Sequence, residues 1–219
     1  MRLYLSSFRL GDHPEHLVAL VDRGRPAAVV ANAMDDEPAE DRAAGVRREV
    51  DALATLGLDA EELDLRAYVE RPERLADDLR TFELLWLRGG NVFLLRYVLA
   101  ASGADRVLAE LLGKDAFVYG GYSAGPCVLG PTLRGLELVD DPEAVTSIYG
   151  EPPMWDGLCV LGYVIVPHVD SPGHPETDRC AAVAARLRAE SVPHRTLRDG
   201  QAIVVDGARV SMPRATSAF

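Results

Sequence analysis

Short apolar runs alternate with longer amphipathic segments along most of the chain. The apolar runs at residues 3–8, 26–34, 83–90, 115–121 and 161–168 have the length of strands and are hydrophobic almost throughout. Such continuous hydrophobicity is typical of parallel strands that are buried on both faces of a sheet. The pattern therefore predicts a sheet core made of these five segments.

Amphipathic helical segments are predicted between these strands. They cover residues 14–22, 40–56, 72–81, 92–112 and 176–190. The fourth of them should break near Gly103. Alternation of strands and helices at this spacing indicates βαβ units, and so a doubly wound, mostly parallel α/β sheet with a flavodoxin-like arrangement. Since no repeat or composition break divides the chain, we expect one domain over residues 1–219.

The last part of the chain carries a different pattern. Asp206 and Gly207 stand between two alternating runs within residues 201–212, which is the signature of a β-hairpin. We expect this hairpin at the C-terminal edge of the sheet.

Composition and charge narrow the possible partners. Hydrophobic residues make up 48% of the 219-residue chain and charged residues 26%, as in ordinary globular proteins. The net charge of −11 argues against nucleic acid and anionic membranes as partners. The sequence lacks an apolar run of roughly 18 residues, and its N-terminus turns polar early, so we expect a cytoplasmic protein. Whether the chain forms a homodimer is left open.

A lone serine stands between a predicted strand and a predicted helix. The segment Gly121-Tyr122-Ser123-Ala124-Gly125 has the G-x-S-x-G pattern of a nucleophile elbow. In such a turn the small neighbours let strand and helix pass closely, and the Ala124 N–H is free to bind an oxyanion. The alternative is a glycine-rich turn whose serine caps the following helix.

A histidine follows another apolar run and could serve as the base. His168 comes directly after the apolar run LGYVIVP at residues 161–167, and we expect it at the same sheet edge as Ser123. An ordinary histidine pKa near 6.5 suits a general base at neutral pH. His174, in the Gly/Pro-rich loop that follows, is a candidate for contact with substrate or a solvated loop residue.

The acid that would orient the histidine is not fixed by spacing. Four carboxylates lie between Ser123 and His168, namely Glu137, Asp140, Asp141 and Glu143. An acidic cluster before a proline is also typical of a solvated turn.

A second glycine pair ends the apolar segment at residues 83–90. Gly89, Gly90 and Asn91 precede a helix, so their amides should reach the same cleft. The segment lacks the GxxxxGK[ST] and GxGxxG patterns and gives little support for nucleotide binding. We expect a second oxyanion donor from the Gly90 N–H, with a plain helix-entry turn as the alternative.

Four segments together resemble the dipeptidase E family of serine peptidases, which is related to cyanophycinase and has a fold like class I glutamine amidotransferases. They are the strand-GGN-helix at 84–95, YGGYSAGP at 119–126, PTLR at 131–134 and VPHVDSPGHPET at 166–177. The resemblance covers roughly residues 1–206.

The resemblance implies a Ser–His–acid triad with Ser123 as nucleophile, His168 as base, and Gly90 and Ala124 as oxyanion donors. Alignment on PTLR places Leu138 where dipeptidase E carries its aspartate, so the adjacent Glu137 is the predicted acid and Asp140 the reserve. The resemblance implies a short peptide as substrate, typically a dipeptide with an N-terminal aspartate, although this chain departs from the family pattern beside the site.

The remaining assignments concern substrate contacts and cofactors. Asn91, Arg134 and His174 are the candidates for substrate binding, and Arg134 could equally be a surface arginine. The mechanism requires neither a metal nor an organic cofactor.

Two alternatives stay open from the sequence. The same triad could act with a different specificity, as a carboxypeptidase or as a dipeptidase without aspartate preference. The chain could also be a non-catalytic binding module of flavodoxin-like fold that kept only the glycine turns. A glutaminase is less favoured, because such enzymes carry cysteine at the position of Ser123.

Overall fold

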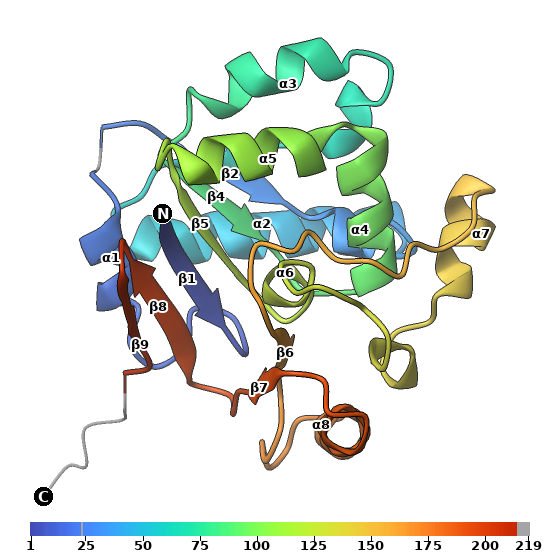
Figure 1. The fold of residues 1–219 in the computed structure, drawn as a ribbon. Helices are drawn as coiled ribbons and strands as arrows, with labels where there is room; N and C mark the ends of the chain where they lie inside the picture. The colour runs from blue at the N-terminus through green and yellow to red at the C-terminus, as the bar shows by residue number, and fades with distance from the viewer. Residues whose placement is uncertain (23, 214–219) are drawn as a thin grey trace, which may run out of the picture.

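A mostly parallel central sheet flanked by helices forms the core of the computed structural model, which describes residues 1–22 and 24–213 (Figure 1). Its strand order within this described part is β3-β2-β4-β5-β1-β8-β9. The first five strands are parallel, whereas β8 and β9 are antiparallel and close one edge. The prediction of a doubly wound α/β sheet with a C-terminal hairpin at its edge is confirmed.

The strands are short, as parallel strands in α/β proteins often are. Their bounds are β1 Arg2–Ser6, β2 Ala27–Val30, β3 Ala60–Glu62, β4 Leu84–Leu87, β5 Val118–Tyr122, β6 Val164–Val166, β7 His194–Thr196, β8 Ala202–Asp206 and β9 Arg209–Ser211.

The helices lie between the strands in the chain. Their bounds are α1 Glu15–Leu20, α2 Ala39–Thr55, α3 Pro72–Leu79, α4 Val92–Ala101, α5 Ala104–Gly113, α6 Ala124–Cys127, α7 Glu143–Tyr149 and α8 Thr177–Ala189. The expected break separates α4 from α5 at Gly103, whose φ of +74° lies in the left-handed region that favours glycine.

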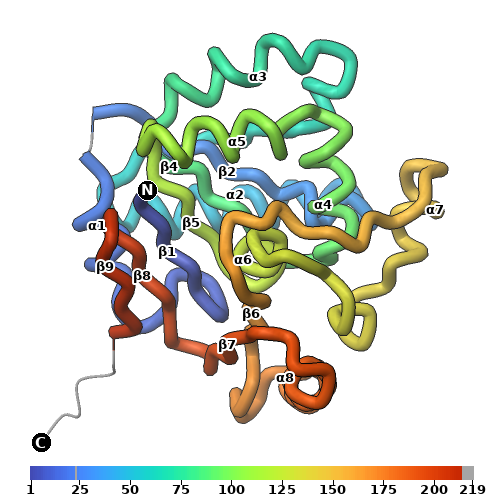
Figure 2. The backbone as a smooth tube through the Cα atoms, viewed as in Figure 1, coloured from blue at the N-terminus to red at the C-terminus, as the bar shows by residue number. Residues whose placement is uncertain are grey.

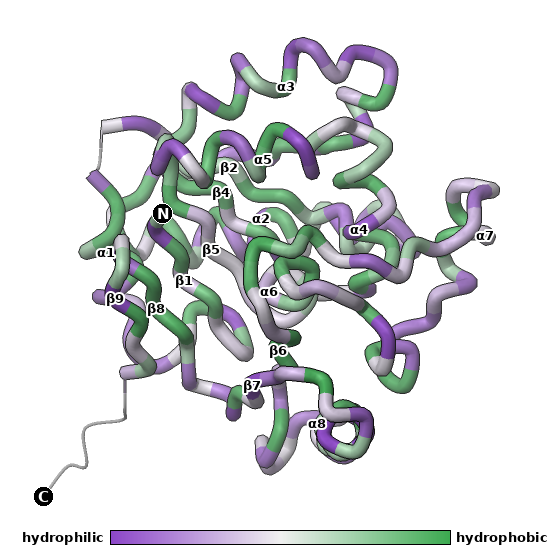
Figure 3. Tube along the Cα trace, in the orientation of Figure 1, coloured by the Kyte–Doolittle hydropathy of each residue, from purple (hydrophilic) through white to green (hydrophobic). Residues whose placement is uncertain are grey.

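Each face of the sheet is buried under its own apolar cluster. Along β4, Leu85 and Leu87 belong to the larger cluster, whereas Leu84 and Trp86 belong to the smaller cluster on the other face. This alternation explains why the strands read as continuous apolar runs. Figure 3 shows the central strands mostly hydrophobic and the outer helix α3 mixed in hydropathy.

One predicted strand has a different place in the fold. The run at 161–168 forms only the three-residue β6, which pairs in parallel with β7 in a separate two-stranded sheet. This small sheet lies beside α6, as the tube in Figure 2 shows, and the Cys127 thiol of α6 donates to the Ile165 carbonyl at 3.3 Å. His168 therefore reaches the edge of the main sheet from outside that sheet.

The structure also bears on membrane insertion. Among the helices in the described ranges, none combines the length and apolar character that a membrane crossing needs.

Candidate active site

Ser123 occupies a sharp turn between β5 and α6. Its φ of +53° and ψ of −109° are uncommon for a residue with a side chain, as expected for a nucleophile elbow. Gly121 makes the turn possible: its φ is +157°, and a β-carbon there would collide with the Leu87 carbonyl oxygen of β4. The turn lies at the carboxyl end of β5, where α/β folds bind ligands.

The two predicted oxyanion donors lie beside this serine. A β-carbon placed on Gly89 would lie 2.9 Å from Ser123 Cβ, so the turn after β4 packs directly on the elbow. Gly90 has a φ of +144°, and a β-carbon there would collide with the Ala33 carbonyl. Within the described part of the chain, the N–H groups of Gly90 and Ala124 donate to no backbone carbonyl, and Gly90 lines the same cavity as Ser123.

His168 is paired with an aspartate that sequence reasoning missed. Its Nδ1 lies 2.7 Å from Asp199 Oδ1, and the imidazole is 2% exposed. Because an ionised carboxylate only accepts hydrogen bonds, Nδ1 carries the proton and Nε2 keeps its lone pair. Such an imidazole is oriented to act as a base.

Burial and a neighbouring ring set the protonation of His168. Desolvation lowers the pKa of His168 below its ordinary value, and the hydrogen bond and charge of Asp199 oppose this shift only partly. The His174 ring stacks on the His168 ring with a centroid separation of 3.7 Å and nearly parallel planes. The Glu176 N–H donates to His174 Nδ1 at 3.2 Å, so the other ring nitrogen of His174 carries its proton in the neutral form.

The structure corrects the predicted acid. Glu137 does not contact His168; its carboxylate forms an ion pair with Arg186 at 2.6 Å and accepts the Gly135 N–H. The reserve candidate Asp140 accepts the Val92 N–H at 2.9 Å, at the start of α4, and burial raises the pKa of Asp140 to about 7. Both carboxylates are used locally, which leaves Asp199 as the partner of the histidine.

Two of the three predicted substrate contacts also change. The Asn91 side chain caps α4, accepting the Phe93 and Leu94 N–H groups at 2.9 and 3.2 Å. Arg134 is exposed, and its guanidinium lies 5.1 Å from the centre of the Trp155 ring. Neither side chain lines the cavity around Ser123, because each is held by its own local contacts.

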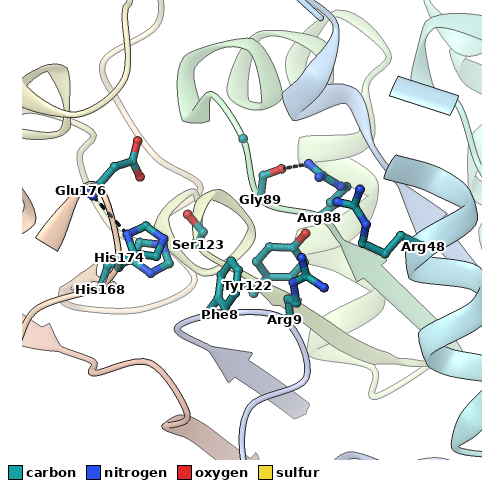
Figure 4. A pocket seen from close by; sticks show the side chains of 11 residues that line it. Phe8, Arg9, Arg48, Arg88, Gly89, Tyr122, Ser123, His168, His174 and Glu176 are labelled. Carbon is teal, nitrogen blue, oxygen red and sulfur yellow. Dashed lines mark hydrogen bonds between the residues drawn. The ribbon is translucent and has the colours of Figure 1, made fainter. Parts of the chain in front are cut away.

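Ser123, His168 and His174 line one cavity of about 240 Å³. Figure 4 shows the two imidazoles on one side of Ser123 and the side chains of Arg48 and Arg88 on the other. Phe8 lies among them, with its ring 5.9 Å from that of His168 and 5.5 Å from that of His174. The cavity is below the roughly 300–1,000 Å³ of drug-sized sites, so it suits a small ligand.

Three arginines line the same cavity, and none was predicted. They are Arg9, Arg48 and Arg88, which come from the loop after β1, from α2 and from the end of β4. Arg88 is held by its bond to the Gly89 carbonyl at 2.7 Å and lies 3.6 Å from the buried Glu49 carboxylate. Against the single carboxylate of Glu176 in the described lining, these three cations give the lining a net positive charge, opposite to that of the whole chain.

Glu49 connects the two strand ends that flank the site. Its carboxylate accepts the Tyr122 hydroxyl at 2.8 Å and the Trp86 indole N–H at 3.0 Å. Tyr122 is the last residue of β5 and directly precedes Ser123. Trp86 lies in β4, shortly before the Gly89–Gly90 turn. One side chain of α2 therefore ties the elbow to the neighbouring amide turn.

Three side chains at the site are of residue types that commonly bind metal ions. Ligand atoms of His168, His174 and Asp199 lie within 4.8 Å of one another. However, the hydrogen bond to Asp199 already occupies His168 Nδ1. The His168 and His174 rings are also stacked in parallel planes, so their in-plane lone pairs do not converge on one metal position. We therefore assign no metal to these residues.

The fold and this site define a hydrolase of the serine type: an elbow serine, an imidazole paired with a carboxylate, and free amides around one cavity. Residues 36–212 match the model of peptidase family S51. The chain belongs to this family and is a serine peptidase. Membership of this peptidase family favours an enzyme over the non-catalytic binding module that the sequence left open.

Similar proteins support this placement. The uncharacterized peptidase Lin0382 of Listeria innocua is 28% identical over 120 residues, which are 55% of this chain and only 54% of that protein. The uncharacterized peptidase Lmo0363 of Listeria monocytogenes is 24% identical over 74% of this chain and 75% of its own.

Two solved structures share the fold. A Listeria monocytogenes protein provisionally described as a peptidase E superposes with a TM-score of 0.78 at 21% identity, over 98% of both chains. A peptidase from an acI-B1 actinobacterium gives a TM-score of 0.71 at 16% identity, over 97% of this chain and 86% of that one.

Proposed function

We propose that this serine peptidase is a dipeptidase that cleaves the bond after an N-terminal acidic residue, with Ser123 as nucleophile, His168 as base and Asp199 as orienting acid. The observation that carries the triad is the 2.7 Å contact between Asp199 and His168, whose imidazole lines the same cavity as Ser123. The cationic lining of that cavity supports the acidic preference.

The first half of the reaction is acyl transfer to Ser123. The hydroxyl attacks the scissile carbonyl carbon while His168 Nε2 takes its proton, and Asp199 stabilises the imidazolium. The carbonyl oxygen becomes negatively charged and is held by the N–H groups of Gly90 and Ala124. His168 then gives the proton to the leaving amine, the C–N bond breaks, and a water repeats the sequence on the acyl-enzyme.

The direction of the substrate follows from the position of the base. Since His168 must protonate the leaving amine, the leaving residue lies at the end of the cavity formed by His168, His174 and Glu176. The acyl residue then lies toward Arg9 and Arg88. A side-chain carboxylate there would form charge-assisted hydrogen bonds with guanidinium groups.

The substrate preference is tested with dipeptides that differ in one group. We expect kcat/KM for Asp-Leu to exceed that for Asn-Leu and Ala-Leu by about 10²-fold, because only the carboxylate pairs with the arginines. Arg88→Met should lower the Asp-Leu value by about 10- to 100-fold and largely remove the preference. Arg195→Met is the matched control, since Arg195 is exposed and lies over the Tyr163 ring.

Other results of this panel decide between specificities. Equal hydrolysis of Ala-Leu and Asp-Leu by the unmodified protein would contradict the acidic preference and favour a dipeptidase of broad specificity. Release of the C-terminal residue from longer peptides with a blocked N-terminus would favour a carboxypeptidase.

The pH dependence follows from the state of His168. Only the neutral imidazole can take the serine proton, and burial lowers its pKa. Activity should therefore fall with decreasing pH only below the ordinary histidine value of about 6.5. A profile of kcat/KM for Asp-Leu from pH 4.5 to 8 measures this midpoint, and a midpoint above 7 would contradict the assignment of His168 as the buried base.

A further inference from the structure

Ser7 lies directly after β1, the strand that runs between β5 and β8 in the sheet. Its side chain is fully buried, with 0% exposure. On one side of β1, strand β5 leads into the elbow at Ser123. On the other side, the turn that contains Asp199 leads into β8. Ser7 therefore stands between two parts of the active site that are far apart in sequence.

The hydrogen bonds of Ser7 reach each member of the triad. Its carbonyl accepts the Ser123 N–H at 3.2 Å. Its hydroxyl oxygen accepts the His168 N–H at 2.9 Å and lies 2.8 Å from Asp199 Oδ1. Because the carboxylate only accepts, the Ser7 hydroxyl donates to the same oxygen that holds His168 Nδ1.

Asp199 and His168 both need such support. The Asp199 side chain is 25% exposed, so water competes for its oxygens and the carboxylate could turn away from the imidazole. His168 has a φ of +60°, an uncommon conformation for a residue with a side chain that its surroundings must hold. The Ser7 hydroxyl acts on both: it fixes one carboxylate oxygen and anchors the backbone that carries the ring.

We propose that Ser7 is a positioning residue that holds Asp199 and His168 in the geometry in which the imidazole can activate Ser123. The proposal rests on the proposed triad and adds a fourth side chain to it. Ser7 touches neither the substrate nor the reacting atoms, so its removal should slow the chemical step and leave substrate binding largely unchanged.

The test compares Ser7→Ala with Ser6→Ala. Ser6 is an equally buried neighbour, and its hydroxyl donates to the Phe8 carbonyl and not to the triad. The rate of Ser123 labelling by a fluorophosphonate reports activation of the serine without dependence on peptide preference. We expect Ser7→Ala to label about 10- to 100-fold more slowly and to lose a similar factor in kcat with KM within threefold, whereas Ser6→Ala stays within threefold.

A spectroscopic measurement separates positioning from loss of fold. The proton shared by His168 Nδ1 and Asp199 should give a downfield NMR signal, which Ser7→Ala shifts or loses while circular dichroism shows an intact fold. If Ser7→Ala does not fold, Ser7→Cys replaces it, since a thiol fills the site and is only a weak donor. In Ser7→Cys, the fluorophosphonate should label Ser123 at least fivefold more slowly than in the unmodified protein.

The outcomes are distinguishable. A folded Ser7→Ala, or failing that Ser7→Cys, that labels less than fivefold more slowly than the unmodified protein overturns the proposal. If the unmodified protein itself is not labelled, the proposed triad fails instead. In that case the NMR signal decides on Ser7, because an unchanged signal in the variant contradicts the role and a lost one supports it.

Discussion

Replacement of Ser123 by alanine should lower kcat for dipeptide hydrolysis by about 10⁴-fold or more, with little change in KM. The hydroxyl is the group that attacks the carbonyl, and no other side chain lining the cavity within the described residues is a serine, threonine or cysteine. The amides of Gly90 and Ala124 remain and would account for residual activity. Initial rates with Asp-Leu measure the effect.

The control for this variant is the replacement of a second serine close to the triad. Ser171→Ala removes a hydroxyl that accepts the Asp199 N–H at 2.8 Å and so lies near the triad without entering the reaction. It should cost much less activity than Ser123→Ala. If Ser123→Ala retained more than a tenth of the activity of the unmodified protein, another nucleophile would have to be sought.

Asp199→Asn should produce the second largest loss, about 10²- to 10⁴-fold in kcat. The amide keeps the size of the carboxylate but cannot stabilise the imidazolium, and it can favour the wrong tautomer of His168. Because the hydrogen bond and the charge of Asp199 both raise the pKa of His168, the acidic limb of the pH profile should also move to lower pH.

Two isosteric controls compare Asp199 with the acids predicted from the sequence. Glu137→Gln weakens an ion pair with Arg186, whose side chain is 39% exposed, and such exposed pairs contribute little to stability. Asp140→Asn changes the cap of α4 and not the histidine. Each should keep kcat within about threefold. A large loss in Glu137→Gln together with full activity in Asp199→Asn would restore the original assignment.

The local parts of the site could be predicted because local sequence determines them. A strand, a turn of small residues and a helix follow one another around Ser123, and the same is true of Gly90. His168 was also predicted, although β6 belongs to the separate sheet. The apolar run that ends just before His168 marks the end of a strand, whichever sheet that strand joins.

Asp199 could not be found in the same way. The search for an acid covered only the segment between Ser123 and His168, whereas the acid comes 31 residues after the histidine. The Asp199-Gly200 pair before an apolar run was the available signal, but such a pair is equally typical of an ordinary turn. The parallel pairing of β7 with β6, together with the packing of β8 against β1, brings this turn to the imidazole.

The specificity residues depend even more on tertiary structure. Arg48 lies on α2 and Arg9 on the loop after β1, and nothing in their sequence neighbours distinguishes them from solvated surface arginines. Conversely, Asn91 and Arg134 stood beside recognisable motifs but are held by local contacts. Nearness to a motif in sequence therefore did not decide which side chains enter the cavity.

The most direct test of the triad is the mapping of a fluorophosphonate adduct by mass spectrometry. A stoichiometric adduct should form on Ser123 of the unmodified protein, with labelling at least 100-fold slower in Asp199→Asn. An adduct on a different residue, or equal labelling rates in the two proteins, would contradict the assignment of Ser123, His168 and Asp199 as one catalytic unit.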